Sequence, residues 1–93
     1  MVADTQLVLA NYRDAEGRFT MWPARRKVQI ALLETLVDAF EVGRRYTEIE
    51  VNAVLNRRHT FGDPATLRRD MVDLGLLHRE RDATAYWIEP RDA

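Results

Sequence analysis

The chain has 93 residues, 46% hydrophobic and 31% charged, with 14 basic and 15 acidic side chains and a net charge of −1. This length and composition predict one globular unit and exclude a disordered chain. The lack of cysteine excludes disulfides and thiolate sites, and no apolar run approaches the roughly 20 residues that span a bilayer. We therefore expect a cytoplasmic protein with neither a signal peptide nor a membrane anchor.

An N-terminal segment, residues 1–22, is expected to precede a helical domain formed by residues 23–90. Residues 4–12 predict either a short helix or an irregular arm, and a turn is expected at residues 14–17. Residues 18–22 are expected to be extended, because the residue before Pro23 is disfavoured in helical angles.

The first helix of this domain is predicted from about residue 24 to residue 40. Its apolar residues recur at helical spacing and form one face that is predicted to be buried: Leu33, Leu36, Val37 and Phe40. Gly43 follows and is a candidate for the left-handed residue that closes the helix.

The second helix has a strong start signal. Thr47 and Glu50 have the spacing of a capping box, in which each side chain accepts from the other residue's backbone N–H. Tyr46 and Val51 are spaced as the accompanying hydrophobic staple. The residues expected to face inward are Val51, Val54 and Leu55, and the helix is predicted to end near residue 57 or 58.

The third helix, residues 63–74, has signals at both ends. Asp63 is a favoured N-cap, and Pro64 suits the first helical position. Gly75 suits the left-handed closing position, and Leu76 is placed to fold back on Met71. The apolar residues at i, i+4 and i+7 form the predicted core stripe: Leu67, Met71 and Leu74.

Two extended segments, residues 77–81 and 85–89, follow and are joined by Asp82, Ala83 and Thr84. The sequence thus predicts an α+β fold, mainly α, with three helices and a C-terminal hairpin. This order is typical of a winged helix-turn-helix, in which the third helix enters the major groove of DNA.

Three stretches of this sequence resemble a family. They are Gly17–Phe19 with Pro23 and Arg25–Lys27; Gly43–Glu48 running into Glu50–Asn52; and Ala65–Arg69 continuing through Val72-Asp73 and Gly75–Leu77 to Arg79 and Tyr86-Trp87. They resemble a small bacterial domain family of unknown function, whose members occur alone or attached to helix-turn-helix transcriptional regulators of the arsenical-resistance-repressor type. The resemblance implies a transcription-related role and brings no established biochemical activity.

The face of the third helix opposite its apolar stripe carries the candidate DNA-reading residues. Arg69 lies nearly opposite the stripe, Thr66 beside it and Arg68 on a flank. Arg69 and Thr66 would contact base edges and Arg68 a phosphate. The alternative is a solvated face on which Arg69 pairs with Asp73 one turn later, and Asp73 would also repel phosphate.

The hairpin carries further candidate phosphate contacts. Arg79 and Arg81 lie two residues apart, on one face of the first extended segment. Thirteen of the fourteen basic residues are arginine, which suits bidentate phosphate and guanine contacts, although a GC-rich genome also favours arginine. The alternatives for Arg79 and Arg81 are charge balance with nearby acids or protection of an edge strand.

A second basic cluster, Arg25, Arg26 and Lys27, lies at the start of the first helix, where the helix dipole disfavours positive charge. Unpaired cations there indicate an external anion or acidic partner; the alternative is a solvated helix start. Tyr86 and Trp87 point to opposite faces of the last strand, so one should close the core and the other is a candidate interface residue.

An enzyme is not expected. The sequence contains no serine, no glycine-rich phosphate loop, and only two histidines without metal-ligand spacing, so we expect no catalytic residues, metal or cofactor. The expected function is a DNA-binding regulator, with a homodimer or a regulatory protein as a further partner. The alternative is a protein-interaction or dimerisation module on the same scaffold without DNA binding.

Overall fold

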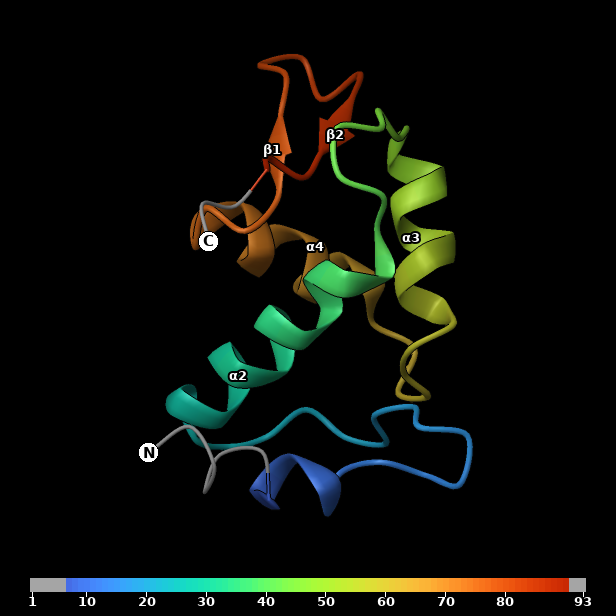
Figure 1. Ribbon diagram of the computed structural model, residues 1–93, viewed down its shortest axis with the longest axis vertical. Coiled ribbons are helices and arrows are strands. Elements are labelled where there is room, and N and C mark those ends of the chain that lie inside the picture. The colour runs from blue at the N-terminus through green and yellow to red at the C-terminus, as the bar shows by residue number, and fades with distance from the viewer. Residues whose placement is uncertain (1–6, 91–93) are drawn as a thin grey trace.

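The computed structural model describes residues 7–90 (Figure 1). Residues 7–10 are helical, and the following elements are the helices α2 (Arg26–Leu36), α3 (Glu48–Asn56) and α4 (Pro64–Asp73), a 3₁₀ turn η1 (Val37–Ala39), and the strands β1 (His78–Arg79) and β2 (Tyr86–Trp87). Within this range the fold is mainly helical with a small antiparallel sheet, as predicted. Figure 1 shows the hairpin and the N-terminal segment at opposite ends of the long axis.

Helix α2 is shorter than predicted, since it changes to a 3₁₀ turn at Val37. The predicted apolar face is confirmed, because all four of its residues are buried: Leu33, Leu36, Val37 and Phe40. The prediction that Gly43 closes this helix is wrong. Gly43 does adopt a positive φ of 80°, but it lies in the following loop, where its N–H donates to the carbonyl of Ile88 at 3.0 Å.

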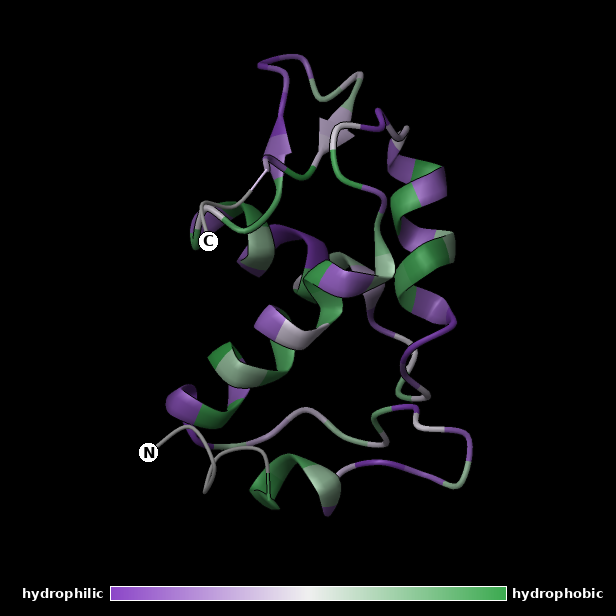
Figure 2. Ribbon diagram, viewed as in Figure 1, coloured by the Kyte–Doolittle hydropathy of each residue, from purple (hydrophilic) through white to green (hydrophobic). Residues whose placement is uncertain are grey.

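Helix α3 begins with the predicted capping box. The N–H of Glu50 donates to Thr47 Oγ1 at 3.2 Å, and the N–H of Thr47 donates to Glu50 Oε1 at 2.8 Å. The hydrogen bond from the Thr47 backbone also holds the pKa of Glu50 below its ordinary value. Val51, Val54 and Leu55 are buried, as expected, so the cap and the buried face together position this helix (Figure 2 shows its alternating hydrophobic and hydrophilic segments).

Helix α4 has both predicted ends. Asp63 Oδ1 accepts from the Thr66 N–H at 3.2 Å, and hydrogen bonding from Thr66 lowers the pKa of Asp63. At the other end Gly75 has a φ of 75°, and the Leu76 N–H donates to the Met71 carbonyl at 2.9 Å. This back-folded closure ends the helix at Asp73.

The predicted stripe of α4 holds only in part. Leu67 and Met71 are fully buried, but Leu74 is 37% exposed, so its assignment to the core is wrong. Leu74 is the first residue beyond the helix, and the closure turns it outward. Leu77, which lies past the turn, is buried instead at 1% exposure.

The hairpin strands are shorter than predicted. His78 pairs with Trp87 and Arg79 with Tyr86, and the loop between them contains Ala83 at a φ of 59°. The sheet is extended beyond β1 and β2 by Tyr46, whose backbone exchanges hydrogen bonds of 2.8 and 2.7 Å with Tyr86. The residue before the α3 cap therefore ties the hairpin to the helical core.

The N-terminal segment is part of the same core. Leu9 and Phe19 are 0% and 2% exposed. The Phe19 N–H donates to the Arg58 carbonyl at 2.8 Å, and the Thr60 N–H donates to the Phe19 carbonyl at 2.8 Å. This segment thus braces the connection between α3 and α4.

His59 joins the end of α3 to the start of α4. It is buried, with Nδ1 2.7 Å from the Leu55 carbonyl oxygen, and Nε2 accepts from the Asp63 N–H at 3.0 Å. This pattern requires the neutral tautomer with its proton on Nδ1. His59 thus links the Leu55 carbonyl at the end of α3 to the Asp63 N–H at the start of α4.

Candidate nucleic-acid interface

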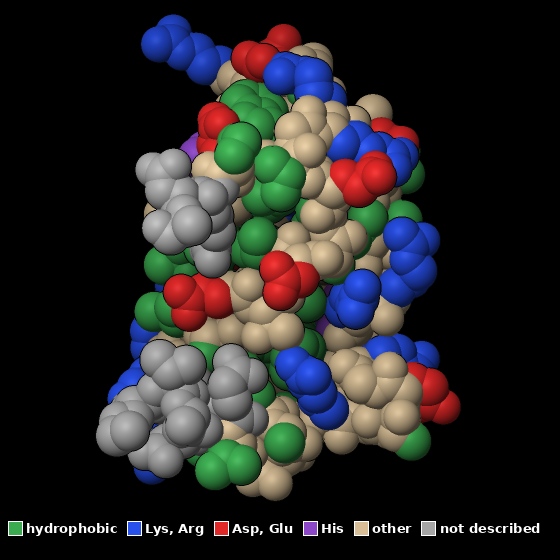
Figure 3. All heavy atoms as spheres, viewed as in Figure 1, with side chains coloured by type: hydrophobic (Ala, Val, Ile, Leu, Met, Phe, Trp, Pro, Cys, Tyr) green, Lys and Arg blue, Asp and Glu red, His purple; other side chains and the backbone are tan. Residues whose placement is uncertain are grey.

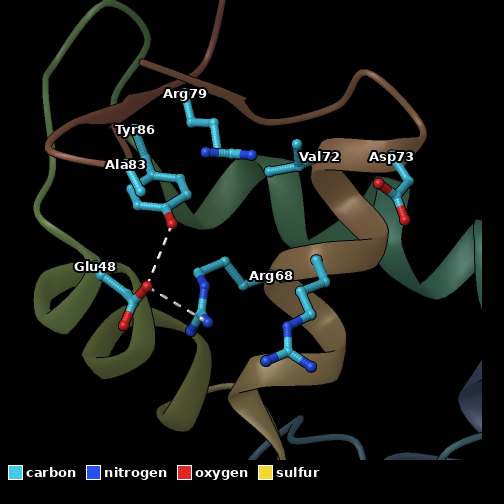
Figure 4. Close-up of a pocket in the computed structure, with 8 residues that line it drawn as sticks. Glu48, Arg68, Val72, Asp73, Arg79, Ala83 and Tyr86 are labelled. Atoms are coloured by element: carbon cyan, nitrogen blue, oxygen red, sulfur yellow. Dashed lines mark hydrogen bonds and ion pairs between the residues drawn. The ribbon is translucent and has the colours of Figure 1, made fainter. Parts of the chain in front are cut away.

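A cavity of about 310 Å³ lies between the first turn of α3, the outer side of α4 and the hairpin (Figure 4). We call it the α4–hairpin cavity. The residues that line it are Glu48, Arg68, Arg69, Val72, Asp73, Arg79, Ala83 and Tyr86. Three of the five residues expected to bind DNA are therefore in this wall: Arg68, Arg69 and Arg79.

Arg68 is buried at 8% exposure, which corrects its expected position on an exposed flank of α4. Nη1 donates to Asn52 Oδ1 at 2.5 Å, and Nη2 lies 3.6 Å from Glu48 Oε1 (Figure 4). The cause is the packing of α3 against α4, which covers the side of the helix that carries Arg68. Arg68 is therefore an internal cation between two helices, and it does not lie on the surface where its phosphate contact was expected.

Arg69 is exposed on the opposite side of α4, together with Thr66 and Asp73. Within residues 7–90 it forms no hydrogen bond or ion pair, so the alternative pairing with Asp73 is not present. Its guanidinium group is available to an external anion.

The two hairpin arginines are also exposed. Arg79 Nη1 donates to the backbone carbonyls of Glu80 and Arg81 at 3.3 Å each, and the Arg81 side chain has no ion pair in the described part of the chain. The alternative of charge balance with nearby acids is not realised at Glu80, because Glu80 pairs with Arg45.

Asp82 is directed at the hairpin loop. Its Oδ1 accepts from the Thr84 hydroxyl at 2.7 Å and from the Thr84 N–H at 3.1 Å. These hydrogen bonds, the one from the Thr84 side chain first, lower the pKa of Asp82. Its carboxylate is thereby occupied in ordering the loop.

Tyr86 and Trp87 take opposite sides of β2, as expected. Tyr86 closes the core at 3% exposure, and its hydroxyl lies 3.4 Å from Glu48 Oε1. The Trp87 ring is partly exposed, with the Arg45 guanidinium 4.7 Å from its centroid and the His78 ring stacked at 6.0 Å. Trp87 is thus engaged within the chain, and its expected interface role stays a prediction.

The basic cluster at the start of α2 is not a set of unpaired cations. Arg26 forms a bidentate pair with Asp70 of α4, at 2.5 and 2.6 Å. The hydrogen bonds from Arg26 hold the pKa of Asp70 below its ordinary value. Arg25 and Lys27 are exposed and, across residues 7–90, form no ion pair. Arg26, the middle residue of this cluster, is therefore not available to the external anion that was expected there.

Sequence reasoning missed the partners of these arginines. Glu48 and Asn52 lie four residues apart on α3, and that spacing alone indicates one shared face. Nothing local indicates that this face meets Arg68, or that Arg26 reaches Asp70 across 44 residues.

No group of three or more potential metal ligands occurs within residues 7–90. Among the helices of that range, none has both the length and the apolar character to cross a membrane.

No curated protein and no solved structure matches this chain. A family model does match, and its span runs from the turn at Arg18 to Ile88 beyond β2. It includes α2, α3, α4 and both hairpin strands. The chain therefore belongs to the family described as "Uncharacterized protein conserved in bacteria (DUF2087)", whose model covers residues 18–88.

Proposed function

We propose that this chain is a winged-helix DNA-binding protein of bacterial transcriptional regulation, with α4 in the major groove and the hairpin against the backbone. The order of elements supports the winged-helix assignment, since three helices are followed by a hairpin. The pairing of Tyr46 with Tyr86 supports it further, because a short extended segment between α2 and α3 joins the hairpin sheet. The proposal assigns α4 the role of the recognition helix.

The observation that carries the proposal is the division of the arginines on and around α4. Arg26 and Arg68 are bound by Asp70, Glu48 and Asn52. Arg69 and Arg79 line the α4–hairpin cavity without an acidic partner in residues 7–90. Arg69 and Arg79 therefore keep their charge unpaired at the same cavity, between the proposed recognition helix and the hairpin.

The acids near this surface are largely occupied. Asp70 is neutralised by Arg26, and Glu80 by Arg45. Asp73 is exposed and acts against DNA binding, so the net attraction comes from Arg69, Arg79 and Arg81. Because an external phosphate needs a donor whose hydrogen bonds are not already used, these three are the assigned contacts.

The second candidate function is a protein-interaction module on the same scaffold. Ile49, in the first turn of α3, is 80% exposed, and Val42 is 58% exposed. Figure 3 shows acidic and basic side chains interspersed on one face of the molecule, without a large basic patch. These features favour a protein partner over a broad electrostatic footprint.

The test compares matched arginine variants in a fluorescence titration with duplex DNA at low salt. Arg69→Met and Arg79→Met should each weaken DNA binding by about tenfold, as expected for loss of one charged contact. Arg57→Met is the control, since Arg57 lines a different cavity, of about 360 Å³, beside α3.

Two outcomes would contradict the DNA-binding function. Equal losses of DNA affinity in all three variants would indicate non-specific charge attraction alone and would contradict the role of α4 as the recognition helix. If DNA does not bind but Ile49→Asp changes the oligomeric state in analytical ultracentrifugation, the interaction module replaces the DNA-binding function.

A further inference from the structure

The α4–hairpin cavity carries a surplus of positive charge on a protein whose net charge is −1. Three arginines and two carboxylates line it. Arg68 and Glu48 lie 3.6 Å apart and offset each other, which leaves Arg69 and Arg79 with Asp73 as the remaining carboxylate of the lining. Asp63, outside the lining, also interacts electrostatically with Arg69. The charged side chains of the lining therefore sum to a formal charge of +1.

The two available guanidinium groups come from different elements. Arg69 is on α4 and Arg79 is on β1, so they approach the cavity from separate walls. Figure 4 shows Arg79 reaching from the hairpin toward Val72, while Asp73 points away from Glu48 and Tyr86.

Arg79 keeps unused donors in this position. Its hydrogen bonds, at 3.3 Å to the Glu80 and Arg81 carbonyls, involve only Nη1. A guanidinium group has five N–H donors in a planar fork that matches two oxygens of a phosphate group. Arg79 can therefore bind phosphate while it stays on the hairpin.

Polar contacts connect the elements around the cavity. Arg68 is held by Asn52 at 2.5 Å, and the Tyr86 hydroxyl lies 3.4 Å from Glu48. These contacts join α3 to α4 and α3 to β2. A preformed site loses less conformational entropy when a ligand binds.

Two other cavities differ in charge or setting. The cavity of about 360 Å³ beside α3 is balanced, with Arg44 and Arg57 against Glu41 and Glu50. A third, of about 230 Å³, contains Arg13, Arg58 and Asp38. There, Arg13 stacks on Phe19 at 4.8 Å and Arg58 follows the C-terminus of α3, whose dipole offsets its charge.

We infer that the α4–hairpin cavity is a binding site for a phosphate group, held between Arg69 and Arg79. The group belongs either to a DNA backbone or to a free phosphate-bearing molecule. Both sources use the same donors, so a free phosphate competes with DNA. The DNA arm of this inference rests on the proposed function, whereas the phosphate site does not.

Titration with inorganic phosphate, against chloride at equal ionic strength, tests the site. The arginine Nε–H resonances of the ¹⁵N-labelled protein report it directly. We expect saturable shifts at Arg69 and Arg79 and an affinity that falls about tenfold in Arg79→Gln and in Arg69→Gln. Arg79→Lys keeps the charge and should retain part of the affinity.

Arg58→Gln is the matched control, because it removes one charge from another cavity with the same surplus. Its phosphate affinity should stay within about twofold of the wild type, since it lies outside the proposed site. Circular dichroism of each variant confirms that it folds. Equal loss in Arg58→Gln, or shifts that do not saturate, would overturn the site.

A competition arm with short duplex DNA separates the two phosphate sources. Displacement of phosphate by DNA assigns the site to the backbone of a bound duplex. Saturable phosphate binding without DNA binding supports the site with a free phosphate ligand, and ends the DNA-binding function. DNA binding without a saturable phosphate site overturns this inference and leaves the DNA-binding function standing.

Discussion

The same substitution should affect different properties of the protein at two adjacent arginines of α4. Arg68 is 8% exposed and bonded to Asn52, whereas Arg69 is exposed and, in residues 7–90, unpaired. Methionine keeps most of the side-chain length and apolar contact and removes only the guanidinium group. Arg68→Met should therefore lower the free energy of unfolding, and Arg69→Met should lower only the affinity for DNA.

The expected loss in Arg68→Met follows from its contacts. A hydrogen bond to a charged group contributes about 1.5–3 kcal/mol. The Glu48 side chain is 51% exposed, so water replaces its lost partner, and the desolvation cost of the guanidinium group is also removed. Together these effects reduce the net loss to about 1–2 kcal/mol, which in a domain of this size lowers Tm by at least about 4 °C.

Thermal unfolding followed by circular dichroism measures this difference, with urea titration as an independent determination. Arg69→Met should stay within about 0.5 kcal/mol of the wild type, as surface substitutions usually do. Unfolding of Arg68→Met at the wild-type temperature, or a larger destabilisation in Arg69→Met, would refute the assignment of Arg68 as a stabilising contact between α3 and α4.

Three further predictions concern stability. Thr47→Ala should cost about 1 kcal/mol through loss of the α3 cap, and Thr47→Ser should restore it; equal urea midpoints for all three proteins would contradict the cap. Gly75→Ala should cost about 1 kcal/mol or more, because Gly75 has a φ of 75°; Gly75→Asn should cost less in the same urea assay. Arg26 lowers the pKa of Asp70, so the pair stabilises the folded state at pH values above the ordinary carboxyl pKa. This stabilisation is lost as the pH falls through the lower pKa that Asp70 has in the folded state. The stability difference between wild type and Asp70→Asn should therefore be full at neutral pH and shrink below about pH 4; a difference that grows in acid would refute the assignment.

The features that could be predicted from the sequence are those decided within a few residues. The Thr47–Glu50 box, the Asp63 cap and the Gly75 closure each depend on neighbours no more than about four residues away. These signals located α3 and α4 and the side of α4 that carries Arg69. The predicted core face of α2 was correct for the same reason, since its periodicity is local.

The two errors that affect the candidate site arose where distant parts of the chain meet. Arg68 was expected on the surface because its partner Asn52 is 16 residues away on another helix. The way in which these two helices pack cannot be predicted from the local sequence. Arg26 was expected to be unpaired because Asp70 lies 44 residues away. Both errors concern charge, and they changed the candidate site from a broad set of arginines to Arg69, Arg79 and Arg81.

The salt dependence of DNA affinity tests the central claim most directly. Binding through phosphate contacts releases counterions, so the logarithm of the association constant should fall linearly with the logarithm of salt concentration between about 50 and 200 mM. Arg79→Gln should reduce the magnitude of this slope by about one contact, and Arg57→Gln should leave it unchanged. No binding at the lower salt, or an affinity independent of salt, would contradict the account of α4 and the hairpin as a DNA-binding surface.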